Sequence, residues 1–211
     1  MTVTINSIRA AAARLKNVAI TTPLISNTFL DEKLKARVFI KPECLQHIGA
    51  FKFRGAYNRL SQLSNEERQL GVVAFSSGNH AQGIALAAKL LNIRATIVMP
   101  SDAPKIKLEG TQRLGASVRE YQRATESREE IAGEIARTTG ATLVPAFDDY
   151  EIMAGQGTVG LEIVDQLAEQ SLLPDVVLTP CGGGGLLAGT STAVKSIIPK
   201  ASVYGVEQEN F

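Results

Sequence analysis

The stretch at residues 175–198 reads DVVLTPCGGGGLLAGTSTAVKSII and indicates the class of fold. A buried β-branched strand over Asp175–Thr179 leads through four glycines into a helical pattern over Leu186–Ile198. This order is typical of α/β proteins. Four consecutive glycines lose much backbone entropy on folding, so a turn with a purely structural role gains nothing from them. They remove every side chain where a phosphate would approach and offer it backbone N–H groups instead.

Strands and helices alternate in the same way along the rest of the chain. We expect strands over residues 37–40, 71–75, 95–99, 117–121, 141–144 and 202–207. Helical patterns cover residues 103–114, 125–138 and 152–170, and a further helix follows residue 78 with Ala81, Ile84, Ala85 and Ala88 on one face. Strict alternation predicts parallel sheet covered on both faces, with ligands at the carboxyl ends of the strands. We therefore predict two α/β domains, a larger one from residues 1–50 plus 147–211 and a smaller one from 51–146, with a ligand between them.

A second turn between a strand and a helix reads Ser76-Ser77-Gly78-Asn79-His80-Ala81-Gln82-Gly83. Its small residues leave backbone N–H groups free at a helix N-terminus, which is a ready site for a carboxylate. Ser77 and Asn79 can add side-chain hydrogen bonds. An ordinary helix cap explains the same residues without a ligand, and His80 taken alone is better explained as a structural residue.

A lysine lies between two phenylalanines in the stretch Gly49-Ala50-Phe51-Lys52-Phe53-Arg54-Gly55-Ala56. Apolar surroundings lower the pKa of an amine and favour the neutral nucleophile that forms a Schiff base. The alternative is a lysine whose stem lies along apolar surface while its ammonium stays in water. This octapeptide alone leaves both interpretations open.

Composition excludes several classes of protein. The 211 residues are 45% hydrophobic and 20% charged with a net charge of +1, which is ordinary for a globular protein and gives no basic surface for nucleic acid. No apolar run approaches the roughly 20 residues that cross a bilayer. Cys44, Cys181, His47 and His80 lack the spacing of a zinc site. We expect a reduced, cytoplasmic protein without nucleic-acid or membrane partners.

The first 30 residues contain Arg9, Arg14 and Lys16 but no acidic residue, which weakly resembles a mitochondrial transit peptide. We favour an N-terminal helix that Asn6 or Ser7 caps and that runs to Leu15.

The glycine run also fits a second kind of site. Gly183, Gly185 and Ala188 match G-x-G-x-x-A after a strand, and Glu207 follows about 20 residues later, as in dinucleotide-binding folds. This alternative gives no role to Lys52 or to the turn at residues 76–83.

Taken together and in this order, the segments resemble the fold-type II pyridoxal-phosphate enzymes, especially serine/threonine dehydratases, serine racemases and 3-hydroxyaspartate ammonia-lyases. The resemblance runs from Thr22-Pro23-Leu24 to Glu207 and includes Ala154-Gly155-Gln156-Gly157-Thr158. It implies the α/β architecture of the tryptophan synthase β-subunit, with the cofactor between two parallel-sheet domains.

The resemblance also implies roles for individual residues. Lys52 forms the Schiff base with pyridoxal 5'-phosphate and then acts as a base. Phe51 packs against the cofactor ring, and Asn79 bonds the ring hydroxyl. The phosphate binds to Gly182, Gly183, Gly184 and Gly185, and the substrate carboxylate binds to Ser76, Ser77, Asn79 and His80. Ser77 matches the serine that faces the lysine across the cofactor in racemising members.

The activity implied is that of a lyase of amino-acid metabolism, which converts L-threonine or L-serine to a 2-oxo acid and ammonia as a homodimer or homotetramer. Serine racemase and 3-hydroxyaspartate ammonia-lyase are alternatives within the family. A dinucleotide-binding module and an inactive fragment are alternatives from other classes. Ala50 replaces the serine of many members, as in the 3-hydroxyaspartate type and some dehydratases.

Members of this family continue well past Phe211, so we expect that the C-terminal part of the large domain is missing. Glu207 matches a ligand for Mg²⁺ or Ca²⁺ in metal-activated members, and the remaining ligands are expected at or beyond the terminus.

Overall fold

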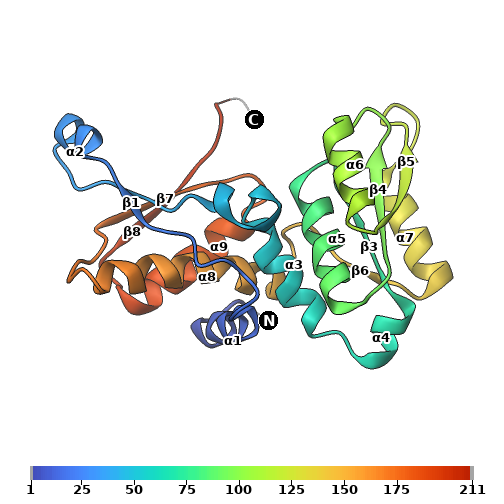
Figure 1. Ribbon diagram of the computed structural model, residues 1–211, viewed down its shortest axis with the longest axis horizontal. Helices are drawn as coiled ribbons and strands as arrows, with labels where there is room; N and C mark the ends of the chain where they lie inside the picture. The colour runs from blue at the N-terminus through green and yellow to red at the C-terminus, as the bar shows by residue number, and fades with distance from the viewer. Residues whose placement is uncertain (1, 210–211) are drawn as a thin grey trace.

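A parallel sheet covered by helices on both faces forms one part of the computed structural model, which describes residues 2–209. The strands lie in the order β5-β4-β3-β6. Their bounds are Val72–Phe75 for β3, Ala95–Pro100 for β4, Ser117–Tyr121 for β5 and Thr142–Leu143 for β6. Successive side chains of a strand point to opposite faces, so Ala74 packs toward α5 (Asn79–Leu91) whereas Val73 packs toward α7 (Arg128–Thr139). Figure 1 shows α5 and α6 (Lys105–Arg113) on one side of this sheet and α7 on the other.

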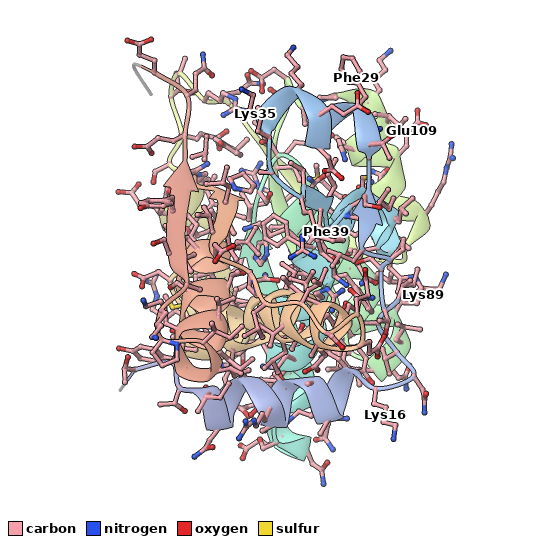
Figure 2. The ribbon with its side chains drawn as sticks, turned by 90° about the vertical axis from the view of Figure 1, so that its left-hand side faces the viewer. Lys16, Phe29, Lys35, Phe39, Lys89 and Glu109 are labelled. Atoms are coloured by element: carbon pink, nitrogen blue, oxygen red, sulfur yellow. The ribbon has the colours of Figure 1, made fainter. Side chains whose placement is uncertain are left out.

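The other part of the molecule is built on a pair of long helices. Helix α8 (Tyr150–Ala168) packs against α9 (Gly185–Ile197), and α1 (Ile5–Leu15) lies across both. A two-stranded parallel sheet of β7 (Val176–Pro180) and β8 (Ser202–Val206) packs against α9. An antiparallel pair, β1 (Ile25–Ser26) and β2 (Phe39–Ile40), flanks the short helix α2 (Thr28–Leu34). Helix α2 buries no residue, and Figure 2 shows Phe29 and Lys35 at the outer edge of the molecule.

Helix α3 (Lys52–Ser61) lies between these two parts, and Figure 1 shows it at the centre of the molecule. Glycines allow it to approach α8 very closely. A Cβ added at Gly155 would lie 2.5 Å from the Cα of Gly55 and 2.7 Å from the carbonyl oxygen of Arg54. Gln156 then reaches the backbone N–H of Gly55, which donates to its Oε1 at 3.3 Å. The stretch 154–158 is therefore the surface on which α3 rests.

A buried ion network holds α3 in register. The Arg54 side chain is 1% exposed and donates to both oxygens of Glu43 and both oxygens of Glu162, at 2.5–3.0 Å. Lys41 bonds Glu162 at 2.6 Å, and burial lowers the pKa of its amine. Two cations thus face two carboxylates, which satisfies charges that would be costly to bury alone.

The sequence predicted the order of the main elements and missed several features. The strand over 117–121 is confirmed residue for residue, but Asn6 and Ser7 were wrong as caps of α1. Thr4 is the cap, since its Oγ1 accepts from the Ser7 N–H and the Ser7 Oγ accepts from the Thr4 N–H. The strand expected over 37–40 is shortened to β2 and is antiparallel rather than parallel. Helices α2, α3, α4 (Asn65–Leu70) and the short 3₁₀ turns Glu43–Leu45 and His47–Gly49 were not predicted.

The strand expected to be buried over 175–179 is buried on one face only. Val176 and Leu178 are 55% and 65% exposed, while Val177 faces α9. No helix within residues 2–209 combines the length and apolar character needed to cross a membrane. The division into domains at residues 50 and 147 stays a proposal.

A pair of alanine substitutions tests the close packing of α3 on α8. Gly155→Ala places a methyl group against backbone atoms of α3, so we expect a loss of about 1–3 kcal/mol in the free energy of unfolding. Gly133→Ala is the control, because an added Cβ on helix α7 meets nothing within 4 Å and should stabilise the protein by up to about 1 kcal/mol. Urea unfolding followed by circular dichroism measures both. Equal effects would contradict the packing described here.

Candidate active site

Lys52 and the turn at residues 76–83 are neighbours because α3 also packs tightly on α5. A Cβ added at Gly83 would lie 3.3 Å from the carbonyl carbon and oxygen of Lys52. Lys52 is the first residue of α3, and Gly78 precedes the first residue of α5. The start of α3 therefore lies against α5 about one turn after α5 begins, which brings the backbone of Lys52 to the end of the stretch 76–83.

The Lys52 amine is half-buried and held by one carbonyl group. Its Nζ donates to the carbonyl oxygen of Ala146 at 2.8 Å and lies 5.3 Å from the centre of the Phe51 ring. Burial lowers the pKa of this amine, because water no longer stabilises its charged form. Phe53, the other phenylalanine next to Lys52, faces the core instead of the amine, since its ring is fully buried against His47 and Tyr57.

The segment 144–147 connects the Lys52 amine to the four glycines Gly182–Gly185, which we call the glycine turn. Ala146 accepts from Lys52, and the next residue, Phe147, packs its ring against Gly183, while its Cβ and backbone lie beside Gly185. A side chain at position 183 would collide with the Phe147 ring. The amine and the glycine turn therefore contact neighbouring residues of one short segment.

The glycine turn presents an open side with free donors. Gly184 is the N-cap of α9 and adopts φ +81°, a conformation that favours glycine. It makes no side-chain capping bond, so the first-turn N–H groups of α9 remain available to an anion. A Cβ added at Gly182 or Gly184 would meet nothing within 4 Å. This open face and the nearby Lys52 amine fit a ligand that carries a phosphate and an aldehyde.

The turn before α5 also leaves most of its backbone donors free. Gly78 is the N-cap of α5 without a side-chain capping bond. Two donors are used, since the Ser76 N–H bonds the carbonyl oxygen of Val98 at 3.1 Å and the Gly78 N–H bonds the Oγ of Ser76 at 3.1 Å. The half-buried Ser77 makes no side-chain hydrogen bond within residues 2–209, and the Oδ1 of Asn79 accepts from Lys107 at 2.8 Å.

The His80 side chain lies in the core rather than in the turn. It is 3% exposed, and its Nε2 lies 3.2 Å from the carbonyl oxygen of Val144. A carbonyl can only accept, so the proton is on Nε2 and Nδ1 is an acceptor, which has no partner within residues 2–209. Burial, with a smaller contribution from the charge of Lys52, lowers the pKa of His80 to about 4. The ring is therefore neutral at pH 7.

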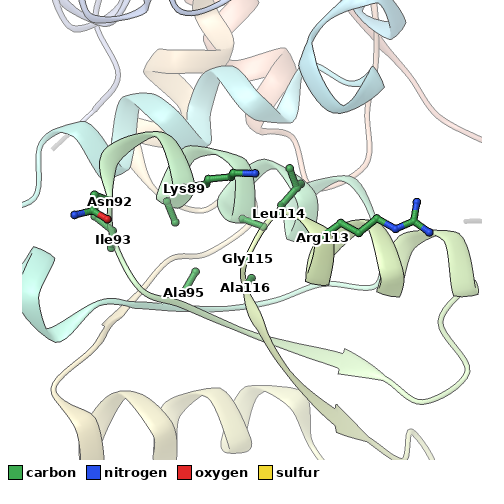
Figure 3. A pocket seen from close by; sticks show the side chains of 10 residues that line it. Lys89, Asn92, Ile93, Ala95, Arg113, Leu114, Gly115 and Ala116 are labelled. Carbon is green, nitrogen blue, oxygen red and sulfur yellow. The ribbon is translucent and has the colours of Figure 1, made fainter.

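The remaining predicted ligand and the surface cavity lie outside this site. Glu207 is exposed after the end of β8. Within the described residues, no three His, Cys, Asp or Glu side chains gather in a group that could hold a metal ion. The cavity in Figure 3 lies between the C-terminal ends of α5 and α6, beside Lys89 and Arg113, at the opposite end of α5 from Asn79.

Sequence reasoning missed Ala146, Phe147 and Lys107 as residues that build the site, and it quoted Gly83 without giving it a role. Gly83 could have been found as a glycine inside a helical pattern of small residues. Ala146, Phe147 and Lys107 carry no local signal, because their contacts join parts of the chain that are far apart in the sequence.

A family model and individual known proteins both match this chain. The model of the family described as pyridoxal-phosphate dependent enzyme matches residues 15–211. The L-threo-3-hydroxyaspartate ammonia-lyase of Saccharomyces cerevisiae is 46% identical over 199 residues, which cover 94% of this chain and 60% of that protein. The L-threonine ammonia-lyase of Thermotoga maritima is 46% identical over 208 residues, which cover 99% of this chain and 51% of that protein.

Among solved structures, maize serine racemase matches with a TM-score of 0.93 and 39% identity, over 98% of this chain and 62% of that one. The chain thus spans about 51–60% of the two ammonia-lyases to which it is similar.

Because the pKa of Lys52 is lowered, we expect its amine to react with an acylating reagent at a lower pH than a free lysine side chain does. A lower pKa means a larger neutral fraction at any given pH, so the acylation rate of Lys52 should reach half its maximum at a lower pH than that of a free lysine side chain. Mass spectrometry of digested protein after short exposure at each pH measures this midpoint. A midpoint at or above that of free lysine would contradict the effect of burial.

Because His80 is buried and neutral, we expect the free energy of unfolding to fall in mild acid. Between pH 6.5 and about 4 the unfolded chain binds a proton at His80 and the folded chain does not. The contribution of His80 to the free energy of unfolding is therefore fully present above pH 6.5. The free energy of unfolding falls by on the order of 3 kcal/mol as the pH drops to 4. His80→Gln keeps a donor for Val144 and removes the titration, so its stability should fall less over this range. Urea unfolding at each pH compares the two proteins, and parallel curves would argue against a neutral buried His80.

Proposed function

The chain belongs to the family of pyridoxal-phosphate dependent enzymes, and we propose that it removes ammonia from hydroxy amino acids such as L-threonine or L-serine to give 2-oxo acids. The observation that carries this proposal is the half-buried Lys52 amine, held by Ala146 beside the glycine turn. When bound, pyridoxal phosphate supplies an electron-withdrawing ring that spreads the negative charge left when a proton departs from the α-carbon of a linked amino acid.

Lys52 is proposed to hold the cofactor aldehyde and then to move the α-proton. Its lowered pKa favours a neutral Nζ, which can attack an aldehyde or accept a proton. The Ala146 carbonyl keeps the amine at the start of α3. Gly182–Gly185 are proposed to hold the phosphate with backbone N–H groups, and Phe51 to pack against the ring.

The turn at residues 76–80 is proposed to hold the substrate carboxylate. The first-turn N–H groups of α5 have no side-chain cap, and the positive end of the helix dipole favours an anion. Ser76, Ser77, Asn79 and His80 surround this position, with His80 contributing through its backbone because its ring is buried against Val144. A carboxylate fixed here places the α-carbon near the Lys52 amine.

Racemisation is a second candidate, and Ser77 is the residue that favours it. Its hydroxyl makes no side-chain hydrogen bond within residues 2–209, and we propose that it returns a proton to the α-carbon when racemisation occurs. The name of the maize structure, a serine racemase, agrees with this possibility. The names of the two ammonia-lyases favour elimination, and 3-hydroxyaspartate is the alternative substrate. A homodimer or homotetramer, a cytoplasmic location and a Mg²⁺ or Ca²⁺ ion at Glu207 remain predictions.

Product analysis tests the proposed activity. Purified protein with added pyridoxal phosphate is incubated with L-threonine, L-serine or 3-hydroxyaspartate, and 2-oxo acid, ammonia and D-enantiomer are each measured. Lys52→Ala should lower all three products by more than about 10²-fold, because it removes both the cofactor link and the base. Lys105→Ala, on the exposed side of α6, should have no effect.

Ser77→Ala separates the two candidate reactions. It should lower the yield of D-enantiomer while elimination changes little. Product formation by the Lys52→Ala protein at the rate of the unmodified protein would contradict the proposed function.

A further inference from the structure

Lys107 on α6 reaches the first turn of α5 and bonds two amide side chains there. Its Nζ donates to the Oδ1 of Asn79 at 2.8 Å and lies 3.4 Å from the Oε1 of Gln82. Asn79 and Gln82 are three residues apart on α5, as Lys107 and Gly110 are on α6, so each pair shares one face of its helix. The Gln82 amide occupies the space that a side chain at Gly110 would fill. The face of α5 that carries Asn79 and Gln82 therefore packs against the face of α6 that carries Lys107 and Gly110.

The chemistry of the ammonium group fixes which end of each amide it meets. A lysine ammonium has three donors and no acceptor, so it bonds the carbonyl oxygen of an amide and repels the NH₂ end. The Oδ1 of Asn79 is therefore turned toward Lys107, and the NH₂ group is the end left free. Within residues 2–209 that NH₂ group makes no hydrogen bond, so it remains a donor for a ligand.

We propose that Lys107 is a positioning residue that orients the Asn79 amide so that its NH₂ group donates to the ring oxygen of pyridoxal phosphate. This inference rests on the proposed function, because it assumes that the cofactor lies beside Asn79. An ionised ring oxygen accepts hydrogen bonds, and a reversed amide would turn the Asn79 carbonyl oxygen toward it. In this proposal Lys107 excludes the reversed orientation through its hydrogen bond to the Oδ1 of Asn79, and not through a contact of its own with cofactor or substrate.

A comparison of two lysines on the same helix tests this role. Lys107→Met removes the donor and keeps a side chain of similar length. Lys105→Met removes the same charge two residues earlier, at an exposed position with no side-chain bond within the described residues. Titration with pyridoxal 5'-phosphate, followed by absorbance, gives the dissociation constant. Lys107→Met should weaken binding roughly tenfold, the scale of one hydrogen bond to a charged group, and Lys105→Met should leave it unchanged.

The same substitution in an Asn79→Ala background separates positioning from a general structural effect. If Lys107 acts through Asn79, then Lys107→Met causes no further weakening once Asn79 is replaced. An unchanged dissociation constant for Lys107→Met overturns the proposal. An equal loss in both backgrounds overturns it as well, because Lys107 would then act by charge or packing rather than through the amide.

A measurement without cofactor keeps this inference distinct from the proposed function. The side-chain ¹⁵N–¹H signals of Asn79, identified by their loss in Asn79→Ala, should shift in Lys107→Met and stay in place in Lys105→Met. Unchanged signals in Lys107→Met show that the hydrogen bond is absent and overturn the inference. Failure of the unmodified protein to bind pyridoxal phosphate overturns the proposed function, whatever the signals do.

Discussion

The close packing of α3 between α5 and α8 is the constraint on which the rest of the site depends. Gly83 lets α5 approach the backbone of Lys52, and Gly155 lets α8 approach Gly55 on the opposite side. Arg54 then joins this helix to Glu43 and Glu162 through buried ion pairs. Removing one partner of such a network leaves an uncompensated buried charge. The position of the Lys52 amine is therefore set by the core and not by a flexible loop.

The same packing determines the electrostatics of the site. Val144 and Ala146, two residues apart, bond His80 and Lys52, while Phe147 covers part of the glycine turn. Exclusion of water lowers the pKa of both titratable groups, so a neutral imidazole lies near an amine that loses its proton easily. The open donors stand at the starts of α5 and α9, where helix dipoles favour anions. One region therefore combines an amine of lowered pKa with two helix N-termini that have no side-chain cap.

Strong local patterns were predicted from the sequence, and long-range contacts were not. The strand at 117–121 carries its own signal in the strand formers Val118 and Tyr121, and the glycine turn carries its signal in the glycines. Helix α3 was missed because Phe53 and Gly55 are weak helix formers, and contacts with α5 and α8 stabilise it instead. The exposure of Leu178 was missed because a short apolar strand looks the same whether one or both of its faces are buried. Ala146 and Lys107 became visible as site residues only in three dimensions.

We propose that the amine of Lys52 and the glycine turn at 182–185 bind one pyridoxal phosphate molecule. The most direct measurement is borohydride reduction of the protein with bound cofactor, followed by digestion and mass spectrometry of the peptides. We expect a pyridoxyl phosphate group on Lys52, and its loss when inorganic phosphate competes for the glycine turn. A label on another lysine, or no label under conditions where a free lysine is labelled, would contradict it.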